Sequence, residues 1–79
     1  MNNYLTAISL NEFNQVLELH DIHVDKHTQI KILRALRSNI YALVNDDYTC
    51  VLEEYISHLA DCNIDSIHNM CTYFKPLLT

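Results

Sequence analysis

Two groups of histidine and cysteine residues carry side chains of the types that bind metals. The first group is His20, His23 and His27, in which His23 and His27 are four residues apart and would share one helix face. However, we expect a helix boundary in this stretch, and no neighbouring cysteine or glutamate completes a ligand set. The favoured interpretation is therefore a solvated loop of histidines and aspartates, and the alternative is a set of histidines that titrate near neutral pH.

The second group is His58, Cys62, His68 and Cys71, which follows the pattern H-x3-C-x5-H-x2-C. All four side chains are zinc-ligand types, and each His–Cys pair has the spacing of one helix face. The pattern matches no zinc finger or ribbon, and the five intervening residues are few for closing a site between two helices. Free cysteines are common in protein cores, so these two suit small core positions equally well. We therefore predict no metal and no other cofactor.

Motifs for catalysis are missing from the sequence. The chain has 79 residues and no glycine, and glycine forms the phosphate-binding loops and strained turns of many active sites. Serine, histidine and aspartate are present, but no nucleophile elbow or paired-carboxylate pattern brings them together. The sequence therefore predicts a non-enzymatic protein with no catalytic residue.

Basic residues gather in one short stretch of an acidic chain whose net charge is −5. Lys31, Arg34 and Arg37 step around one side of the expected helix, Tyr41 follows them, and Tyr48 comes after the next turn. We predict that these five residues contact a protein partner, with an ordinary solvated face as the alternative. A contact with DNA phosphates would need a dimer that sets two basic ridges side by side, and the net negative charge disfavours it.

Hydrophobic periodicity predicts the helices that position these side chains. Ser9 and Glu12 form a capping box for a helix that ends near His20, with Ile8 and Phe13 as its hydrophobic staple. The buried stripe of this helix is Leu10, Phe13, Val16 and Leu17. Asp25 or Thr28 caps the longest helix, from about Lys26 to Val44, whose apolar arc is Ile32, Leu33, Leu36, Ile40, Leu43 and Val44.

Two further helices follow in the second half of the chain. Asn45 is expected to be a left-handed helix terminator, and Asp47 to cap a helix from about Tyr48 to Asp61. Glu53 and Glu54 are expected to lie outside, and the core-facing or coiled-coil-like seam to be Val51, Leu52, Tyr55, Ile56, Leu59 and Ala60. The last helix should stop before Pro76, near Lys75, with a stripe of Ile64, Ile67, Met70, Cys71 and Phe74.

These elements predict one all-α domain over residues 1–79, a compact bundle of three or four short helices with a flexible N-terminus at residues 1–8. A domain this small buries limited surface as a monomer, so we expect a homodimer. No apolar run approaches the ~20 residues that cross a bilayer, and the N-terminus lacks the pattern of a signal peptide. With three cysteines that form no disulfide framework, we expect a cytoplasmic protein without membrane contact.

The segment from Ile30 to Leu78 resembles the small enterobacterial regulators of the AriR/YmgB biofilm and two-component connector family. The resemblance rests on three features: the first apolar helix, the Asn45-Asp46-Asp47 link, and the two apolar helices separated by a polar break at residues 61–65. It implies an all-α dimer that acts on regulatory partners and on DNA. Family members often have a glycine in the first main helix, which this chain lacks, and no functional residue is transferred.

Together these observations predict a small non-enzymatic regulatory or adaptor protein. It would bind a partner protein and modulate its activity, in the setting of bacterial gene regulation that the resemblance implies. One alternative is a DNA-binding or nucleoid-associated regulator that acts as a dimer. A further alternative is a phage- or plasmid-type antagonist or immunity protein.

Overall fold

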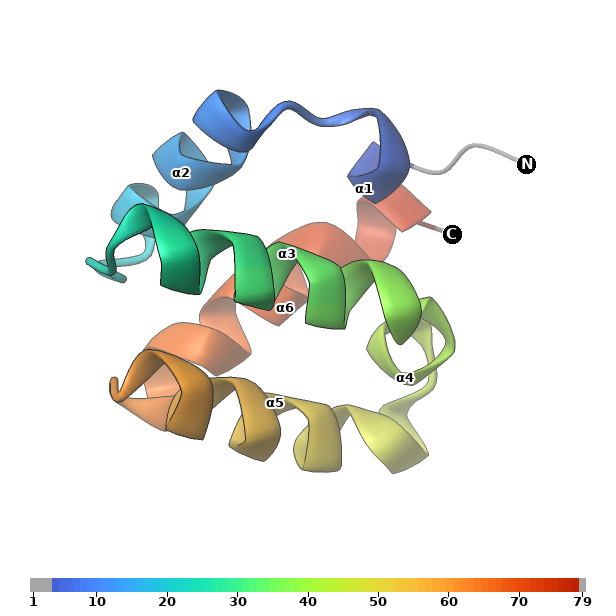
Figure 1. Ribbon diagram of the computed structural model, residues 1–79. Coiled ribbons are helices and arrows are strands. Elements are labelled where there is room, and N and C mark those ends of the chain that lie inside the picture. The colour runs from blue at the N-terminus through green and yellow to red at the C-terminus, as the bar shows by residue number, and fades with distance from the viewer. Residues whose placement is uncertain (1–3, 79) are drawn as a thin grey trace.

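The computed structural model describes residues 4–78, and this part of the chain is helical, without strands. Figure 1 shows α3 across the middle of the molecule, with α6 behind it, α1 and α2 on one side, and α4 and α5 on the other. No helix within residues 4–78 is both long and apolar enough to cross a membrane. The six helices of this described part are α1 (Tyr4–Ala7), α2 (Leu10–Leu19), α3 (Lys26–Ser38), α4 (Ile40–Val44), α5 (Asp46–Ala60) and α6 (Ile64–Leu78).

The hydrophobic core is built around α3 and α6, and it confirms the all-α prediction and most of the predicted stripes. Phe74 of α6 is fully buried, and its ring lies 6.0 Å from that of Phe13 and 6.1 Å from that of Tyr4, measured between centroids. Burying one such side chain contributes about 2–3 kcal/mol. The core residues of the predicted stripes are Phe13, Val16, Leu17, Ile32, Leu33, Leu36, Leu43, Leu52, Ile56, Ile67, Met70, Cys71 and Phe74.

The first described residues belong to this core, so the prediction of a flexible segment over 1–8 is wrong for residues 4–8. Leu5 is fully buried in α1, and Ile8 is buried just after it. Arg37 donates from Nε to the carbonyl of Leu5 (2.7 Å) and from Nη2 to the carbonyl of Ile8 (3.1 Å). Apolar burial and these two hydrogen bonds together hold α1 against α3. Residues 1–3 lie outside the described part of the chain.

Helix starts follow the predicted capping residues closely. The backbone N–H of Glu12 donates to Ser9 Oγ (3.1 Å), and Ser9 Oγ in turn donates to Glu12 Oε1 (3.0 Å), which confirms the capping box. The N–H of Thr28 donates to Asp25 Oδ1 (2.8 Å) and lowers the pKa of that carboxyl. The cap of α5 is Asn45, two residues earlier than the expected Asp47.

Aspartates take the left-handed positions that glycine would otherwise occupy. Among residues 4–78 the positive φ angles belong to Asp21 (61°) and Asp61 (50°). Aspartate tolerates this conformation better than most residues because its short side chain bonds locally to the backbone. Asn45 was expected to play this part after α4, but its backbone is extended, with φ −111° and ψ 110°.

The longest predicted helix is broken at Asn39 into α3 and α4. Asn39 Nδ2 donates to the carbonyl of Ala35 (2.7 Å), which is the acceptor that the Asn39 backbone N–H would use in a continuous helix. That N–H bonds instead to the carbonyl of Leu36 (3.2 Å). The side-chain amide thus competes with the helical ladder, and α4 leaves the axis of α3.

Pro76 does not end the last helix, contrary to the sequence-based prediction. α6 continues to Leu78 with the proline inside it. Proline removes one backbone donor, but here it stands in the final turn, so only the end of the ladder is affected. Burial of Phe74 just before it holds this end of α6 in the core.

The core position of Leu36 leads to a first prediction. Leu36→Asp should prevent folding, because a carboxylate in this fully buried position costs several kcal/mol, comparable to the stability of a whole small domain. Circular dichroism melting curves measure the effect. Leu19→Asp is the matched control, since Leu19 is 72% exposed, and it should melt like the wild type. A cooperative wild-type melting curve for Leu36→Asp would contradict the helix orientation.

Candidate functional site

The candidate site begins with the width of the apolar arc on α5. At about 100° per residue, the arc from Val51 to Ala60 covers roughly half of the helix circumference. The core contacts only one part of it, where Leu52 and Ile56 are buried. Val51 is 70% exposed and Tyr55 56% exposed. Of the two predicted alternatives for this seam, the core-facing one is therefore wrong for these two residues, and an unpartnered apolar face remains on α5.

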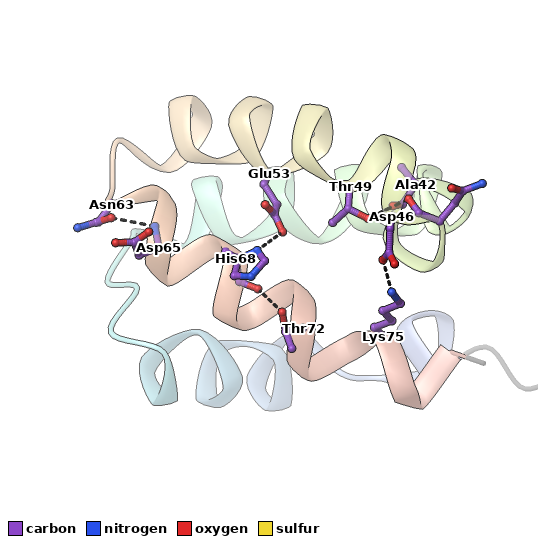
Figure 2. Close-up of polar contacts among 10 residues, drawn as sticks. Ala42, Asp46, Thr49, Glu53, Asn63, Asp65, His68, Thr72 and Lys75 are labelled. Atoms are coloured by element: carbon purple, nitrogen blue, oxygen red, sulfur yellow. Dashed lines mark hydrogen bonds and ion pairs between the residues drawn. The ribbon is translucent and has the colours of Figure 1, made fainter.

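Polar contacts with α6 and α4 hold α5 in this orientation (Figure 2). Glu53, which was expected to lie outside, is buried and accepts a hydrogen bond at Oε2 from His68 Nδ1 of α6 (2.9 Å). Thr49 Oγ1 donates to the carbonyl of Ala42 in α4 (2.6 Å). Lys75 of α6 pairs with Asp46 at the start of α5. The Glu53 and Thr49 contacts are partly buried and lie on the side of α5 that faces its neighbouring helices, whereas Val51 on the opposite side stays open.

An open groove of about 1000 Å³ lies between α3 and the exposed side of α5. The two helices run side by side in opposite directions, and α4 connects them at one end (Figure 1). The wall of the groove on α3 is basic, whereas its floor and its wall on α5 are apolar. The lining residues are Lys31, Arg34, Ala35, Ser38, Asn39, Tyr41, Ala42, Tyr48, Val51, Leu52, Tyr55 and Leu59.

Two tyrosines lie at the α4 end of this groove. The rings of Tyr41 and Tyr48 are tilted against each other, with centroids 5.6 Å apart. Asn45 Nδ2 donates to the hydroxyl of Tyr41 (2.9 Å), which orients that ring. Both side chains are still more than half exposed. Such rings present a preorganised apolar surface with a polar tip, a combination common in protein interfaces.

The structure therefore brings together four of the five residues predicted to bind a partner. Lys31, Arg34, Tyr41 and Tyr48 all line the groove. Sequence reasoning missed Val51 and Tyr55, because the apolar pattern of α5 does not show which part of the arc the core covers. The apolar arc of α5 is wider than the part of a helix that one core contact buries. This width was the signal in the sequence that could have indicated an exposed apolar face.

Arg37 is the one predicted partner-binding residue that the structure leaves outside the groove. It lies toward α1 and α2, where its guanidinium holds the carbonyls of Leu5 and Ile8. A small hollow on this side of α3 is lined by Arg37, Arg34, Leu10, Ile30, Leu33 and Ser38. The geometry gives Arg37 a structural task, and its part in partner binding stays a prediction.

The groove differs in charge from the rest of the protein. Lys31 and Arg34 stand on its α3 wall, and none of the described lining residues is acidic. Neither cation makes a hydrogen bond or ion pair with residues 4–78. The charge of Lys31 acts within the fold only weakly, as a minor contribution, after the Thr28 backbone N–H, to the lowered pKa of Asp25. A chain of net charge −5 thus carries a locally positive groove.

The histidine and cysteine groups do not form metal-ligand sets. Within residues 4–78, no three His, Cys, Asp or Glu side chains lie close enough to hold a metal ion. His20 and His58 each bond through Nδ1 to the carbonyl four residues earlier, 2.8 Å away in both cases. His23 pairs instead with Asp21 (2.9 Å). Cys71 is buried, which matches the core alternative considered from the sequence.

Comparisons with known proteins add no family to this description. No protein-family model matches the chain, and no curated protein or solved structure matches it either. The resemblance to the AriR/YmgB connectors therefore remains an expectation from the hydrophobic pattern. The groove itself is the basis for the functional argument.

The different environments of Arg37 and Arg34 give a second prediction. Arg37→Gln should lower the free energy of unfolding by about 1–2 kcal/mol, because the carbonyls of Leu5 and Ile8 lose their charged donor. Urea denaturation followed by circular dichroism measures this change. Arg34→Gln is the control and should stay within about 0.5 kcal/mol of the wild type. Equal stability of the two variants would contradict the role assigned to Arg37.

The cysteines give a third prediction. Burial, with a smaller contribution from Glu53, raises the pKa of Cys71 to about 12, so its thiol stays protonated and inert. Iodoacetamide at about pH 8 should alkylate the exposed Cys50 first and leave Cys71 unmodified until urea unfolds the protein. Peptide mass spectrometry follows each site. Labelling of Cys71 at the rate of Cys50 in the native protein would contradict its burial.

Proposed function

We propose that this protein is a small non-enzymatic regulator or adaptor that binds a partner protein through the α3–α5 groove and changes the partner's activity. The proposal rests on one observation: four exposed apolar or aromatic side chains line the same groove, whose other wall carries two cations. The four residues are Tyr41, Tyr48, Val51 and Tyr55. Aromatic residues and arginine are the side chains enriched at the centres of protein interfaces. The partner would be blocked or bridged by packing against this surface.

The shape of the groove supports binding more than turnover. It is open along the length of α5, and its floor and one wall are apolar. Catalytic centres concentrate titratable groups with shifted pKa values in a cleft. Among residues 4–78 the groups with shifted pKa values are Cys62, Cys71, Tyr4 and Asp25, and none of them lines the groove. A docking surface accounts for the exposed apolar side chains without any further chemistry.

Protein binding is favoured over DNA binding for the same surface. Within the described part of the chain, only Lys31 and Arg34 bring a positive charge to the groove, and they lie beside exposed tyrosine and valine side chains. A DNA contact draws its affinity from many phosphate pairs, whereas this surface would draw it from apolar burial. The proposed setting is the cytoplasm, where the three free cysteines stay reduced.

The proposal retains the prediction of a homodimer, with one condition. A dimer compatible with partner binding has to use another surface and leave the groove open. Light scattering coupled to size-exclusion chromatography gives the oligomeric state directly. Val51→Asp should leave that state unchanged, because Val51 belongs to the partner surface in this proposal.

Affinity capture and reconstitution test the function in a fourth prediction. A partner identified by capture from the native cell and then purified should bind the wild-type protein in isothermal titration calorimetry. Val51→Asp should weaken this binding by at least about tenfold, because it places a charge in the middle of the apolar surface.

Leu19→Asp is the matched control, with equal exposure on a different helix, and should bind like the wild type. Both variants should have wild-type melting curves, which separates binding from folding. A purified partner that binds Val51→Asp as tightly as the wild type would contradict the groove as the binding surface.

A further inference from the structure

We infer that the occupant of the groove is an amphipathic helix of the partner protein, with acidic residues along one flank of its apolar stripe. This inference rests on the function proposed above and specifies the partner's chemistry. Three properties of the groove indicate this occupant: the spacing of its apolar residues, the placement of its cations and the absence of acids from its described lining.

The spacing of the apolar residues suits a helix. Tyr48, Val51, Tyr55 and Leu59 follow one another along α5 at intervals of three, four and four residues. At 1.5 Å per residue this stripe is about 17 Å long, or about three helical turns. A partner helix of the same length can set its own residues at i, i+3 or i+4, and i+7 against it. The described residues contain no strand, so no sheet edge competes for an extended peptide.

The cations define the flank of that partner helix. Lys31 and Arg34 are three residues apart on α3, which spaces them by one helical turn along the wall of the groove. Covering the groove removes water from both charges, and this is costly unless an opposite charge replaces the water. Two Asp or Glu residues at i and i+3 or i+4 on the partner helix satisfy both cations at once.

Charge also argues against a second copy of this chain as the occupant. A symmetric dimer would place the same patch of both copies face to face. Lys31 and Arg34 of each copy would then share one interface, and none of the described lining residues is acidic. An acidic helix from a different protein matches this surface, whereas the surface does not match itself.

Two designed peptides test the inference. Each is a fluorescein-labelled, capped peptide of about 16 residues with the same leucine stripe at helical spacing, and the flanking positions carry either glutamate or lysine. Fluorescence anisotropy with the full-length protein should show the glutamate peptide binding at least about tenfold more tightly at about 50 mM salt. The difference should shrink markedly at about 500 mM salt.

Variants then assign the effect to the groove. Lys31→Glu combined with Arg34→Glu should reverse the preference between the peptides, whereas Lys26→Glu, a change outside the groove, should leave it intact. Val51→Asp should weaken both peptides. Circular dichroism of each variant establishes that it is folded, so that a loss of binding reports on the surface.

Several results would overturn the inference. The first is that neither peptide binds at concentrations up to about 1 mM. The second is equal affinity for both peptides, and the third is a wild-type dimer that the Val51→Asp substitution dissociates. Groove-dependent binding of duplex DNA would overturn it as well. If a captured partner depends on Val51 while the peptides are not distinguished, this inference fails alone. A captured partner that is indifferent to Val51 removes the proposed function itself.

Discussion

The orientation of α5 about its own axis determines which of its side chains are buried and which are exposed. Leu52 and Ile56 anchor one part of a wide apolar arc in the core, and Glu53 turns inward to meet His68. A buried carboxylate without a partner would be expensive, so the contact with His68 opposes any other rotation of the helix. Because this side of α5 is buried, Val51 and Tyr55 on its other side are exposed to solvent. The exposed side chains then form one wall of the groove.

The way a glycine-free chain turns shapes the same surface. Asn39 breaks the long helix by taking the carbonyl of Ala35 with its side chain, and α4 then leaves the line of α3. This bend brings Tyr41 beside Tyr48 and closes one end of the groove. Asp21 and Asp61 supply the left-handed residues after α2 and α5. Asn39 thus ends its helix through a local hydrogen bond, and the two aspartates adopt the left-handed backbone that glycine adopts in other folds.

This acidic chain has only five lysine and arginine residues, and two of them make contacts within the fold. Arg37 is occupied by the carbonyls that hold α1, and Lys75 by Asp46. Lys31 and Arg34 are left on the groove wall without a partner among residues 4–78. Because a partner can offset the desolvation of these charges only with acids of its own, the groove in the proposed complex would select by charge as well as by shape. Recognition by such a surface needs no catalytic group.

The sequence alone determined the helical class, most of the capping residues and most of the core, because these depend on local periodicity and on side chains within one turn. The capping box at Ser9 and the buried stripe through Leu36 are examples. Tertiary packing decided the rest. Glu53 became an inner residue and Val51 an outer one because α6 and α4 contact only one part of the apolar arc of α5. Arg37 bonds to carbonyls that lie far away in the chain, and it therefore does not line the groove. Local periodicity places residues on a helix face, but only the neighbouring helices determine how much of that face is covered.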